Sequence, residues 1–312
     1  MKLDKNFLII IIASILVYSA FIVISDLDVF KQKIINFKTE YLPIILILVP
    51  CGWMFIFLRW RILLKNTGLK IKLKDDFLIY FSGYSLAISP GRVGELLKAL
   101  LLKNKYDIPI KKSAPLVLVE KIYTLIGVVS VSIVGLWISH IALYITLVGI
   151  SILVIIFIVI FKRKIFLKLL RKLSRFKFAS KRIEPIADSY ETIRNSFKPN
   201  VIILCSLLSV IHWLIESVGV YFIFLSLGIN IIDYFTVVFA YSSSILIGAL
   251  SFIPGGIGVM ESSFAGLLST QNVDFSLALT ATIFVRIFTL WYGVVAGFVA
   301  LKFVGNITEF KS

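Results

Sequence analysis

The chain alternates between long apolar stretches and short polar segments. Six stretches are uninterrupted, at residues 7–24, 42–58, 114–137, 141–161, 201–227 and 275–301. A helix that crosses a bilayer needs about 20 mostly apolar residues, so these stretches predict about six spanning helices. The first stretch follows Lys2 and Lys5, as in a signal peptide, but no small-residue cleavage site follows it, so we expect it to be retained as a span.

Two further apolar stretches, 77–102 and 234–269, are each interrupted near the middle. Proline removes a backbone donor and glycine loosens the backbone, so both tend to end a helix. The predicted helix breaks are at Pro90, Gly91, Gly94, Pro254, Gly255, Gly256 and Gly258. We expect each stretch to form two short helices that turn back as a re-entrant hairpin, because bare backbone at membrane depth must be covered by protein or water.

Composition supports a membrane protein. Apolar residues make up 59% of the 312 positions, charged residues make up 16%, and the mean hydropathy is +0.99. Soluble domains are about 45–50% apolar and about 25% charged. The sequence therefore predicts an all-α, polytopic integral membrane helix bundle that forms a single domain over residues 1–312.

The basic residues predict the topology. The formal net charge is +16, and most of the 33 lysines and arginines fall in residues 1–6, 59–112, 162–200 and 302–312. With six spans and two hairpins that return to their own side, these segments share one face. Basic residues are enriched on cytoplasmic loops, so we expect a cell-membrane protein with both termini in the cytoplasm. Their position beside apolar spans argues against a nucleic-acid partner.

The two hairpins have opposite predicted orientations. The first enters from the basic face and the second from the other face. Glu95 and Glu120 are as far apart in the chain as Glu261 and Arg286. Paired, interrupted segments of opposite orientation indicate an inverted repeat and point to the central site of a transporter. The alternative is that two Pro-Gly breaks coincide by chance.

Residues 162–198 form a basic segment that we expect to be cytoplasmic. Between 162 and 178, apolar and basic residues recur with helical spacing, which predicts an amphipathic helix on the inner leaflet. The apolar face contains Ile165, Phe166, Leu169, Leu170, Leu173 and Phe176, and the basic face contains Lys164, Lys168, Arg171, Lys172 and Arg175. This helix anchors the topology or, alternatively, recruits anionic lipid headgroups.

Several ionisable residues fall inside the apolar stretches. They are Arg92, Glu95, Glu120, Lys121, His212, Glu216, Glu261 and Arg286. A charge at the centre of a membrane helix costs roughly 2.5–3.5 kcal/mol, so we expect these side chains to face the bundle interior and one another. His212 and Glu216, four apart, share a helix face. The charges form a functional network or, alternatively, only hold helices together.

The breaks supply helix ends as well. A helix that restarts after Gly94 directs free N–H groups and its positive dipole end at the break. Such ends bind phosphate or carboxylate, and Arg92 is placed to bind the same anion. The second break offers the same arrangement from the other side. We therefore expect two anion-facing helix ends near mid-membrane, with Lys121 and Arg286 beside them.

No motif indicates a metal or a cofactor. Cys51 and Cys205 lie in apolar stretches without metal-ligand spacing, and we interpret both as buried thiols. The nucleotide-binding pattern G-x-x-x-x-G-K-[ST] is absent. The segment Gly83-Tyr84-Ser85-Leu86-Ala87 is a weak match to a nucleophilic serine turn, because the last glycine is missing and no acid is placed to orient His140 or His212.

Four features carry a resemblance to a known family. They are S-P-G-R-V-G-E-L-L-K at 89–98, E-K at 120–121, I-P-G-G-I-G-V-M-E at 253–261, and Arg286 in the last span. In order and spacing they resemble the flippase-like transmembrane region of the lysylphosphatidylglycerol synthase family, over nearly the whole chain. The resemblance implies movement of lipids between leaflets, with Arg92, Glu95, Glu120, Glu261 and Arg286 as the functional set. Bifunctional members carry an aminoacyl-transfer domain after this region, and because this sequence ends at Ser312 we expect no lipid aminoacylation.

These features favour a lipid translocase that is not an enzyme. A polar headgroup would slide through a polar seam between the hairpins while the lipid tails stay in the bilayer. His212 and Glu216 are candidates for ion coupling. The alternatives are a scaffold that assists a partner enzyme of lipid modification and, less favoured, an intramembrane enzyme that uses Ser85 and His212.

Overall fold

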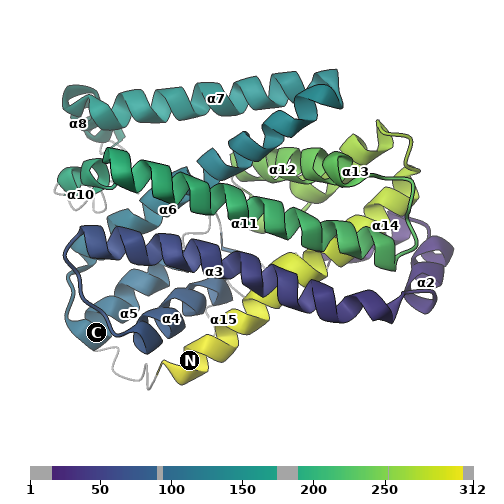
Figure 1. Ribbon diagram of the computed structural model, residues 1–312, viewed down its shortest axis with the longest axis horizontal. Helices are drawn as coiled ribbons and strands as arrows, with labels where there is room; N and C mark the ends of the chain where they lie inside the picture. Colours follow the sequence, from purple (N-terminus) through teal and green to yellow (C-terminus); the bar gives the residue numbers. More distant parts are fainter. Residues whose placement is uncertain (1–15, 90–93, 174–188, 252, 305–312) are drawn as a thin grey trace.

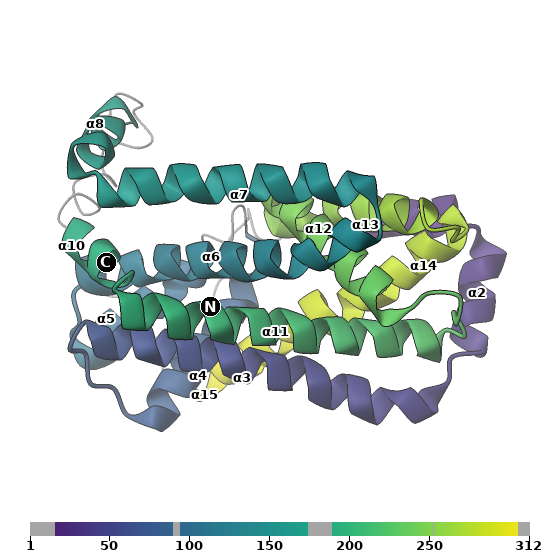
Figure 2. The ribbon, with the colours of Figure 1, turned by 45° about the horizontal axis from the view of Figure 1, so that its top comes forward.

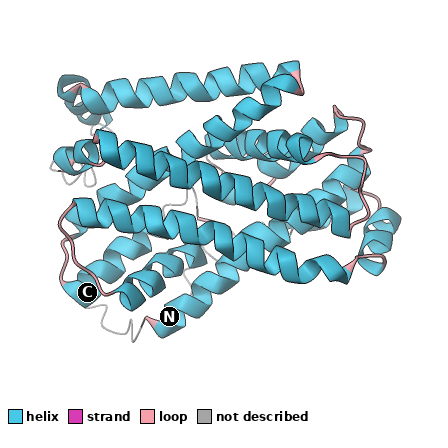
Figure 3. Cartoon of the chain, in the orientation of Figure 1, coloured by secondary structure: helices cyan, strands magenta, loops and turns pink. Residues whose placement is uncertain are grey.

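The computed structural model describes residues 16–89, 94–173, 189–251 and 253–304. These residues form helices and loops without a strand (Figure 3), which confirms the predicted all-α fold. Residues 16–24 are helical. The other elements are α2 (Leu27–Ile35), η1 (Thr39–Tyr41), α3 (Leu42–Asn66), α4 (Leu73–Ser82), η2 (Gly83–Leu86), α5 (Leu97–Tyr106), α6 (Ile110–Ser132), η4 (Ile133–Trp137), α7 (His140–Phe161), α8 (Arg163–Leu173), α10 (Tyr190–Asn195), α11 (Pro199–Ser226), α12 (Tyr234–Leu250), η5 (Pro254–Gly256), α13 (Val259–Ser269), α14 (Phe275–Arg286), η6 (Ile287–Trp291) and α15 (Tyr292–Phe303).

Five helical segments are long and apolar enough to cross a membrane. They are Thr39–Asn66, Ile110–Trp137, His140–Phe161, Pro199–Ser226 and Phe275–Phe303. They match five of the six predicted spans. Of the predicted span at 7–24, residues 7–15 lie outside the described residues and 16–24 are helical. Within the last segment, α14 and α15 are joined by η6, a π-helical turn that directly follows Arg286.

The spans form a bundle in which α3 and α11 lie side by side and α7 lies on the outside (Figures 1 and 2). Along α7 only Ala142, Thr146, Gly149 and Ile160 are buried. Its exposed side chains are almost all aliphatic or aromatic, and Leu147, Val154 and Ile155 are examples. An apolar helix with so little protein contact is suited to a lipid environment.

The first broken stretch folds as two antiparallel helices, α4 and α5. Lys105 Nζ and Tyr106 OH, at the end of α5, donate hydrogen bonds of 2.8 and 2.6 Å to the carboxylate of Asp75, at the start of α4. These bonds, the one from Lys105 foremost, lower the pKa of Asp75. The two outer ends of the stretch therefore meet. Pro90, Gly91 and Arg92 lie outside the described residues, and the backbone N–H of Gly94 donates to Ser89 Oγ at 2.6 Å.

The second broken stretch also turns back on itself. Met260 of α13 lies against Gly248 of α12, and the rings of Phe264 and Tyr241 are 5.7 Å apart. Gly248 is opposite Met260 and the earlier Tyr241 is opposite the later Phe264, so α12 and α13 are antiparallel. The break falls between them as predicted, at Pro254–Gly258, where Gly255 and Gly258 have φ values of 62° and 91° that favour glycine. That either hairpin is re-entrant in a membrane stays a prediction.

The two hairpins occupy opposite ends of the bundle, with α4 and α5 on the left of Figure 1 and α12 and α13 on the right. Within each half of the chain, the second hairpin helix packs on the span that follows it, α5 on α6 and α13 on α14. Across the halves, the first hairpin helix packs on the other half's span, α4 on α15 and α12 on α6. Such reciprocal packing is what an inverted repeat would produce.

The two ends of the bundle differ in charge. The left end in Figure 1 gathers the end of α3, the start of α4, the α5–α6, α7–α8 and α10–α11 junctions, and the end of α15. Its described basic residues include Lys65, Lys70, Lys72, Lys74, Lys103, Lys105, Lys111, Lys112, Lys162, Arg163, Lys198 and Lys302. The opposite end carries Lys31, Lys33 and Lys38 together with Asp26, Asp28, Glu40, Asp233 and Asp274. The described residues therefore have the predicted charge asymmetry, and the cytoplasmic assignment of the basic end stays a prediction.

Two local predictions meet different outcomes. The helix predicted at 162–178 is present as α8 over Arg163–Leu173, and 174–188 lie outside the described residues. Cys205 is buried, as expected, but Cys51 is exposed, so the interpretation of two buried thiols is wrong for Cys51. Cys51 lies beside the buried stripe of α3, which includes Val49, Gly52 and Trp53, and so it faces outward.

The contact between α15 and η2 allows a test of the reciprocal packing. A Cβ atom at Gly297 would lie 2.2 Å from the backbone nitrogen of Ser85. Gly297→Ala should therefore lower the free energy of unfolding by about 1–3 kcal/mol, the usual cost of overpacking. Gly266→Ala is the matched control, because nothing lies within 4 Å of that position on α13. Thermal unfolding in detergent should separate the two variants, and equal midpoints would contradict the packing.

Candidate functional site

Each hairpin contributes a glutamate that pairs with a cation on the following span. Lys121 Nζ on α6 lies 2.5 Å from Glu95 Oε2, which precedes α5. In the other half, Arg286 Nε on α14 donates to Glu261 Oε1 on α13. The sequence predicted that these charges face one another, and for these pairs the structure agrees. The same pairing in both halves ties each hairpin to its span.

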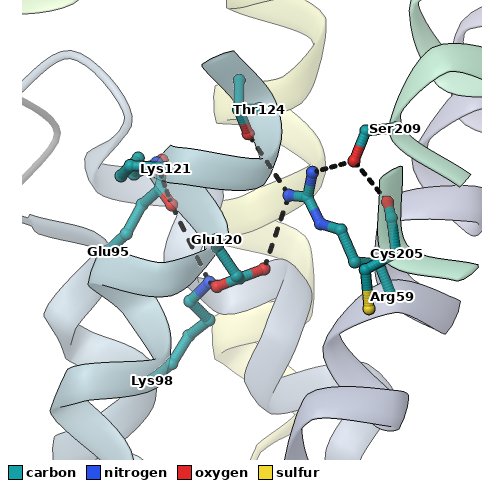
Figure 4. Close-up of polar contacts among 8 residues, drawn as sticks. All are labelled: Arg59, Glu95, Lys98, Glu120, Lys121, Thr124, Cys205 and Ser209. Carbon is teal, nitrogen blue, oxygen red and sulfur yellow. Dashed lines mark hydrogen bonds and ion pairs between the residues drawn. The ribbon is translucent and has the colours of Figure 1, made fainter. Parts of the chain in front are cut away.

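A buried ion cluster surrounds Glu120 on α6 (Figure 4). Lys98 Nζ of α5 donates to Glu120 Oε2, and Arg59 Nη2 of α3 lies 3.9 Å from Glu120 Oε1. Arg59 also donates to Ser209 Oγ at 2.8 Å and to Thr124 Oγ1 at 3.3 Å. Helices α3, α5, α6 and α11 are therefore joined by polar contacts within the bundle.

Lys98 is held on several sides. Its side chain is 3% exposed, and its ammonium lies 4.7 Å from the ring centres of both Trp60 and Tyr80. Glu95 Oε2 lies 3.8 Å away. Aromatic faces attract cations, and the attraction grows when water is excluded. This cage fixes the ammonium where it neutralises Glu120.

The cluster holds more positive than negative charge. Arg59, Lys98 and Lys121 face Glu95 and Glu120, so these five described residues carry one excess positive charge. Arg59 and Lys98 are almost fully buried, whereas the Lys121 side chain is 32% exposed. Lys121 is therefore the cation of this cluster that reaches space outside it.

Glu261 occupies the start of its own helix. Its Oε2 accepts the backbone N–H of Gly258 at 2.7 Å, and its Oε1 accepts the hydroxyl of Tyr18 at 3.0 Å. Arg286 Nη2 donates to the carbonyl of Gly255 at 2.6 Å. Glu261 is completely buried. The predicted anion-facing end of α13 is thus filled by a carboxylate of the chain itself, and Gly255 at this break is half-buried while Gly256 is buried.

A cavity of about 350 Å³ brings the two halves together. Its polar and backbone lining comes from Lys121 and Thr124 of α6, Trp213 of α11, Gly255 and Gly256 of η5, and Arg286 of α14. The rest of its described lining is apolar or glycine. Lys121 and Arg286, which sequence reasoning placed beside the two breaks, thus share one cavity, and both charged residues in its lining are cationic.

His212 and Glu216 form a third group on α11. His212 Nε2 lies 3.4 Å from Glu216 Oε2, and Tyr241 of α12 donates to Glu216 Oε1 at 2.6 Å. All three side chains are buried. The ring of Tyr241 also lies 6.2 Å from that of Trp213, which lines the cavity. The group is therefore next to the cavity without being part of its described lining.

Arg59 and Lys98 are not among the site residues predicted from the sequence, which places both on the basic cytoplasmic face. Helical spacing contained a signal for Arg59, because Gly52, Ile56, Arg59 and Leu63 fall on one stripe of α3 and are all buried. Lys98 follows Glu95 by three residues, a spacing that places charges together on a helix. Arg92 lies outside the described residues, so the structure does not place it.

Metal binding finds no support in the described parts of the chain. Within them, no group of three histidine, cysteine, aspartate or glutamate side chains is arranged to hold an ion. Ser85, the weak candidate for a nucleophilic serine, donates its hydroxyl to the carbonyl of Ser82 at 2.7 Å. The expectation that the protein uses no cofactor stays a prediction.

The Arg286–Glu261 pair predicts a strong coupling energy. Replacement of one member of a buried ion pair leaves the other uncompensated and typically costs about 3–5 kcal/mol. Arg286→Met and Glu261→Met should each destabilise the protein strongly. The double variant should lose much less than the sum of the two, whereas Lys31→Met, on an exposed position of α2, should change little. Additive losses in detergent unfolding would contradict the pairing.

Comparison with known proteins places the chain among membrane proteins of a lipid-related family. A family model described as the lysylphosphatidylglycerol synthase TM region matches residues 11–297. The UPF0104 membrane protein MJ1078 of Methanocaldococcus jannaschii is 29% identical over 217 residues, which cover 68% of this chain and 90% of the relative. The UPF0104 membrane protein PH1989 of Pyrococcus horikoshii is 26% identical over 267 residues, 77% of this chain and 79% of the relative. No solved structure matches the chain significantly.

Proposed function

The chain belongs to the family of the lysylphosphatidylglycerol synthase TM region, and from this premise we propose that it moves a polar-headgroup lipid between the leaflets of a membrane. The observation that carries the proposal is the cavity of about 350 Å³ between the two halves, which Lys121 and Arg286 line together. Charged side chains within spanning segments are costly and mark substrate paths by default.

The arrangement of the hairpins supports a path across the bilayer. They lie at opposite ends of the bundle, and the break of the second reaches the cavity through Gly255 and Gly256. Hairpins that enter from opposite faces bring irregular backbone to mid-membrane, where transporters place their sites. A headgroup would occupy the cavity while its acyl chains remain in the lipid beside the apolar spans.

We infer the orientation of the protein in the membrane from the distribution of its basic residues. Basic residues gather at the end where α3, α5, α7 and α15 finish, and such ends face the cytoplasm of a cell membrane. We assign both termini to that side on the same grounds. Helix α8, with its basic and apolar faces, would lie on the inner leaflet there.

Energy for transport would come from a gradient or from a partner, because the sequence lacks a nucleotide-binding loop. The group of His212, Glu216 and Tyr241 is a candidate for proton coupling. It is buried, hydrogen-bonded, and next to Trp213 at the cavity wall. Histidine is the side chain whose charge changes most readily near neutral pH.

Two other functions compete with transport. A scaffold for a lipid-modifying enzyme would need the helix bundle but would have no use for the cavity. An intramembrane hydrolase would need Ser85 activated by a base, yet the described hydrogen bond of Ser85 runs to the Ser82 carbonyl. We favour transport because the cavity joins charged residues from both halves of the chain.

Reconstitution in lipid vesicles tests the proposal. The purified protein should move a labelled phospholipid from one leaflet to the other, as measured by loss of label accessible to an external quencher. Lys121→Gln and Arg286→Gln should each slow the movement by roughly tenfold or more, because each removes a charge from the cavity wall. Lys31→Gln is the matched control on the exposed helix α2.

Folding has to be checked alongside. The Lys121 side chain is 32% exposed, so Lys121→Gln should keep a thermal midpoint close to that of the parent. A folded parent protein that moves lipid no faster than empty vesicles would contradict the proposal and favour a scaffold. Full activity in both substituted proteins would contradict the choice of cavity.

A further inference from the structure

We infer that the cavity receives an anionic phosphate group, so that the lipid moved is one whose headgroup carries a phosphate and no cationic substituent. The inference rests on the proposed function and specifies its substrate class. It arises from the sign of the charges on the cavity wall, from the position of their carboxylate partners outside that wall, and from the hydrogen-bond donors among the lining side chains.

The wall of the cavity is positive. Lys121 and Arg286 are the charged residues of its described lining, and they come from spans in different halves of the chain. Their partners Glu95 and Glu261 do not belong to the described lining. A group in the cavity therefore meets the cations directly and the carboxylates only beyond them. Cations presented in this way on both sides of a small space are complementary to an anion.

The carboxylates that pair with nearby cations leave the wall itself positive. Lys121 pairs with Glu95, Lys98 with Glu120 and Arg286 with Glu261, and none of these carboxylates belongs to the described lining. Glu216 accepts from Tyr241 and lies near His212, also outside the described lining. A phosphate diester, with a single negative charge, would therefore meet cations and no carboxylate side chain on this wall.

The charged side chains that line the cavity are hydrogen-bond donors. Lys121 and Arg286 only donate, and the buried indole N–H of Trp213 has no partner among the described residues. Trp213 is 7% exposed and lines the cavity. The lining hydroxyl of Thr124 already receives a bond from Arg59. Phosphate oxygens are acceptors, so they match this set of donors, whereas an ammonium brings more donors.

The dimensions suit a small headgroup. About 350 Å³ lies near the lower limit of sites for small molecules, which begin at about 300 Å³. The apolar wall, which includes Leu125, Val128, Ile245 and Met260, offers contact to methylene groups. An amine-bearing headgroup, such as the lysyl group in the family's name, would instead place like charges beside Lys121 and Arg286.

A headgroup series in vesicles tests the inference. Three lipids with the same labelled acyl chain are compared, namely anionic phosphatidylglycerol, zwitterionic phosphatidylethanolamine and cationic lysylphosphatidylglycerol. We expect the anionic lipid to move about tenfold faster than the cationic one, because like charges oppose each other in the cavity. Equal rates, or faster movement of the cationic lipid, would overturn the inference while leaving lipid transport in place.

A charge-swapped variant sharpens the test. Glu95→Lys with Lys121→Glu keeps an ion pair between the two positions but exchanges the signs, so the wall gains a carboxylate. The preference for the anionic lipid should fall at least several-fold towards the cationic one. The neutral variant Lys121→Gln should weaken the preference without reversing it, and it serves if the swapped protein does not fold. An unchanged preference in a folded variant would overturn the assignment.

A binding measurement in detergent tests recognition of the headgroup independently of transport. Short-chain phosphatidylglycerol should raise the thermal midpoint of the parent protein more than short-chain phosphatidylcholine, and Lys121→Gln should abolish the difference. This result would support a site for an anionic headgroup in the cavity even if no lipid moved in vesicles, in which case only the proposed transport would fail. Equal shifts with inorganic phosphate alone would support the anion site but overturn the lipid as its source, and no preference for either anion would overturn the site.

Discussion

A charge inside a bundle that faces lipid must be paired, because neither hydrocarbon nor dry protein can solvate it. In this protein the requirement is met by the same pair in both halves, a glutamate at the second helix of a hairpin and a cation on the span that follows. Glu95 with Lys121 and Glu261 with Arg286 hold the breaks against the spans. The position of the cavity follows, since each pair presents its cation to the space between the halves.

Much of this arrangement could be predicted from the sequence. The lengths of the apolar stretches and the Pro-Gly interruptions depend on local chemistry, and so five spans and the second break were found correctly. Ionisable residues in apolar stretches have few stable positions other than the interior. Glu120, Lys121, Glu261 and Arg286 were therefore recognised as members of a network before any contact was known.

The rest depended on tertiary contacts. A count of basic residues per loop cannot distinguish an inward-facing arginine from a solvated one, so Arg59 and Lys98 were assigned to the surface although both are buried. The free end of α13 was expected to face a ligand, but Glu261 folds back onto Gly258. Cys51 faces outward because the stripe of α3 that meets α11 excludes it. In each case the outcome depends on a contact with a residue distant in the chain or on the conformation of a side chain.

The reciprocal packing has a consequence for the order of biosynthesis. Helix α4 makes contact with α15, which is the last described helix of the chain, so the first hairpin leaves the ribosome long before its partner exists. Until α15 is inserted, Tyr84 and Ser85 of η2, which lie against Gly297, lack this neighbour. Completion of this contact must therefore wait for the last described span, and a ribosome that stops before it would leave both halves unfinished.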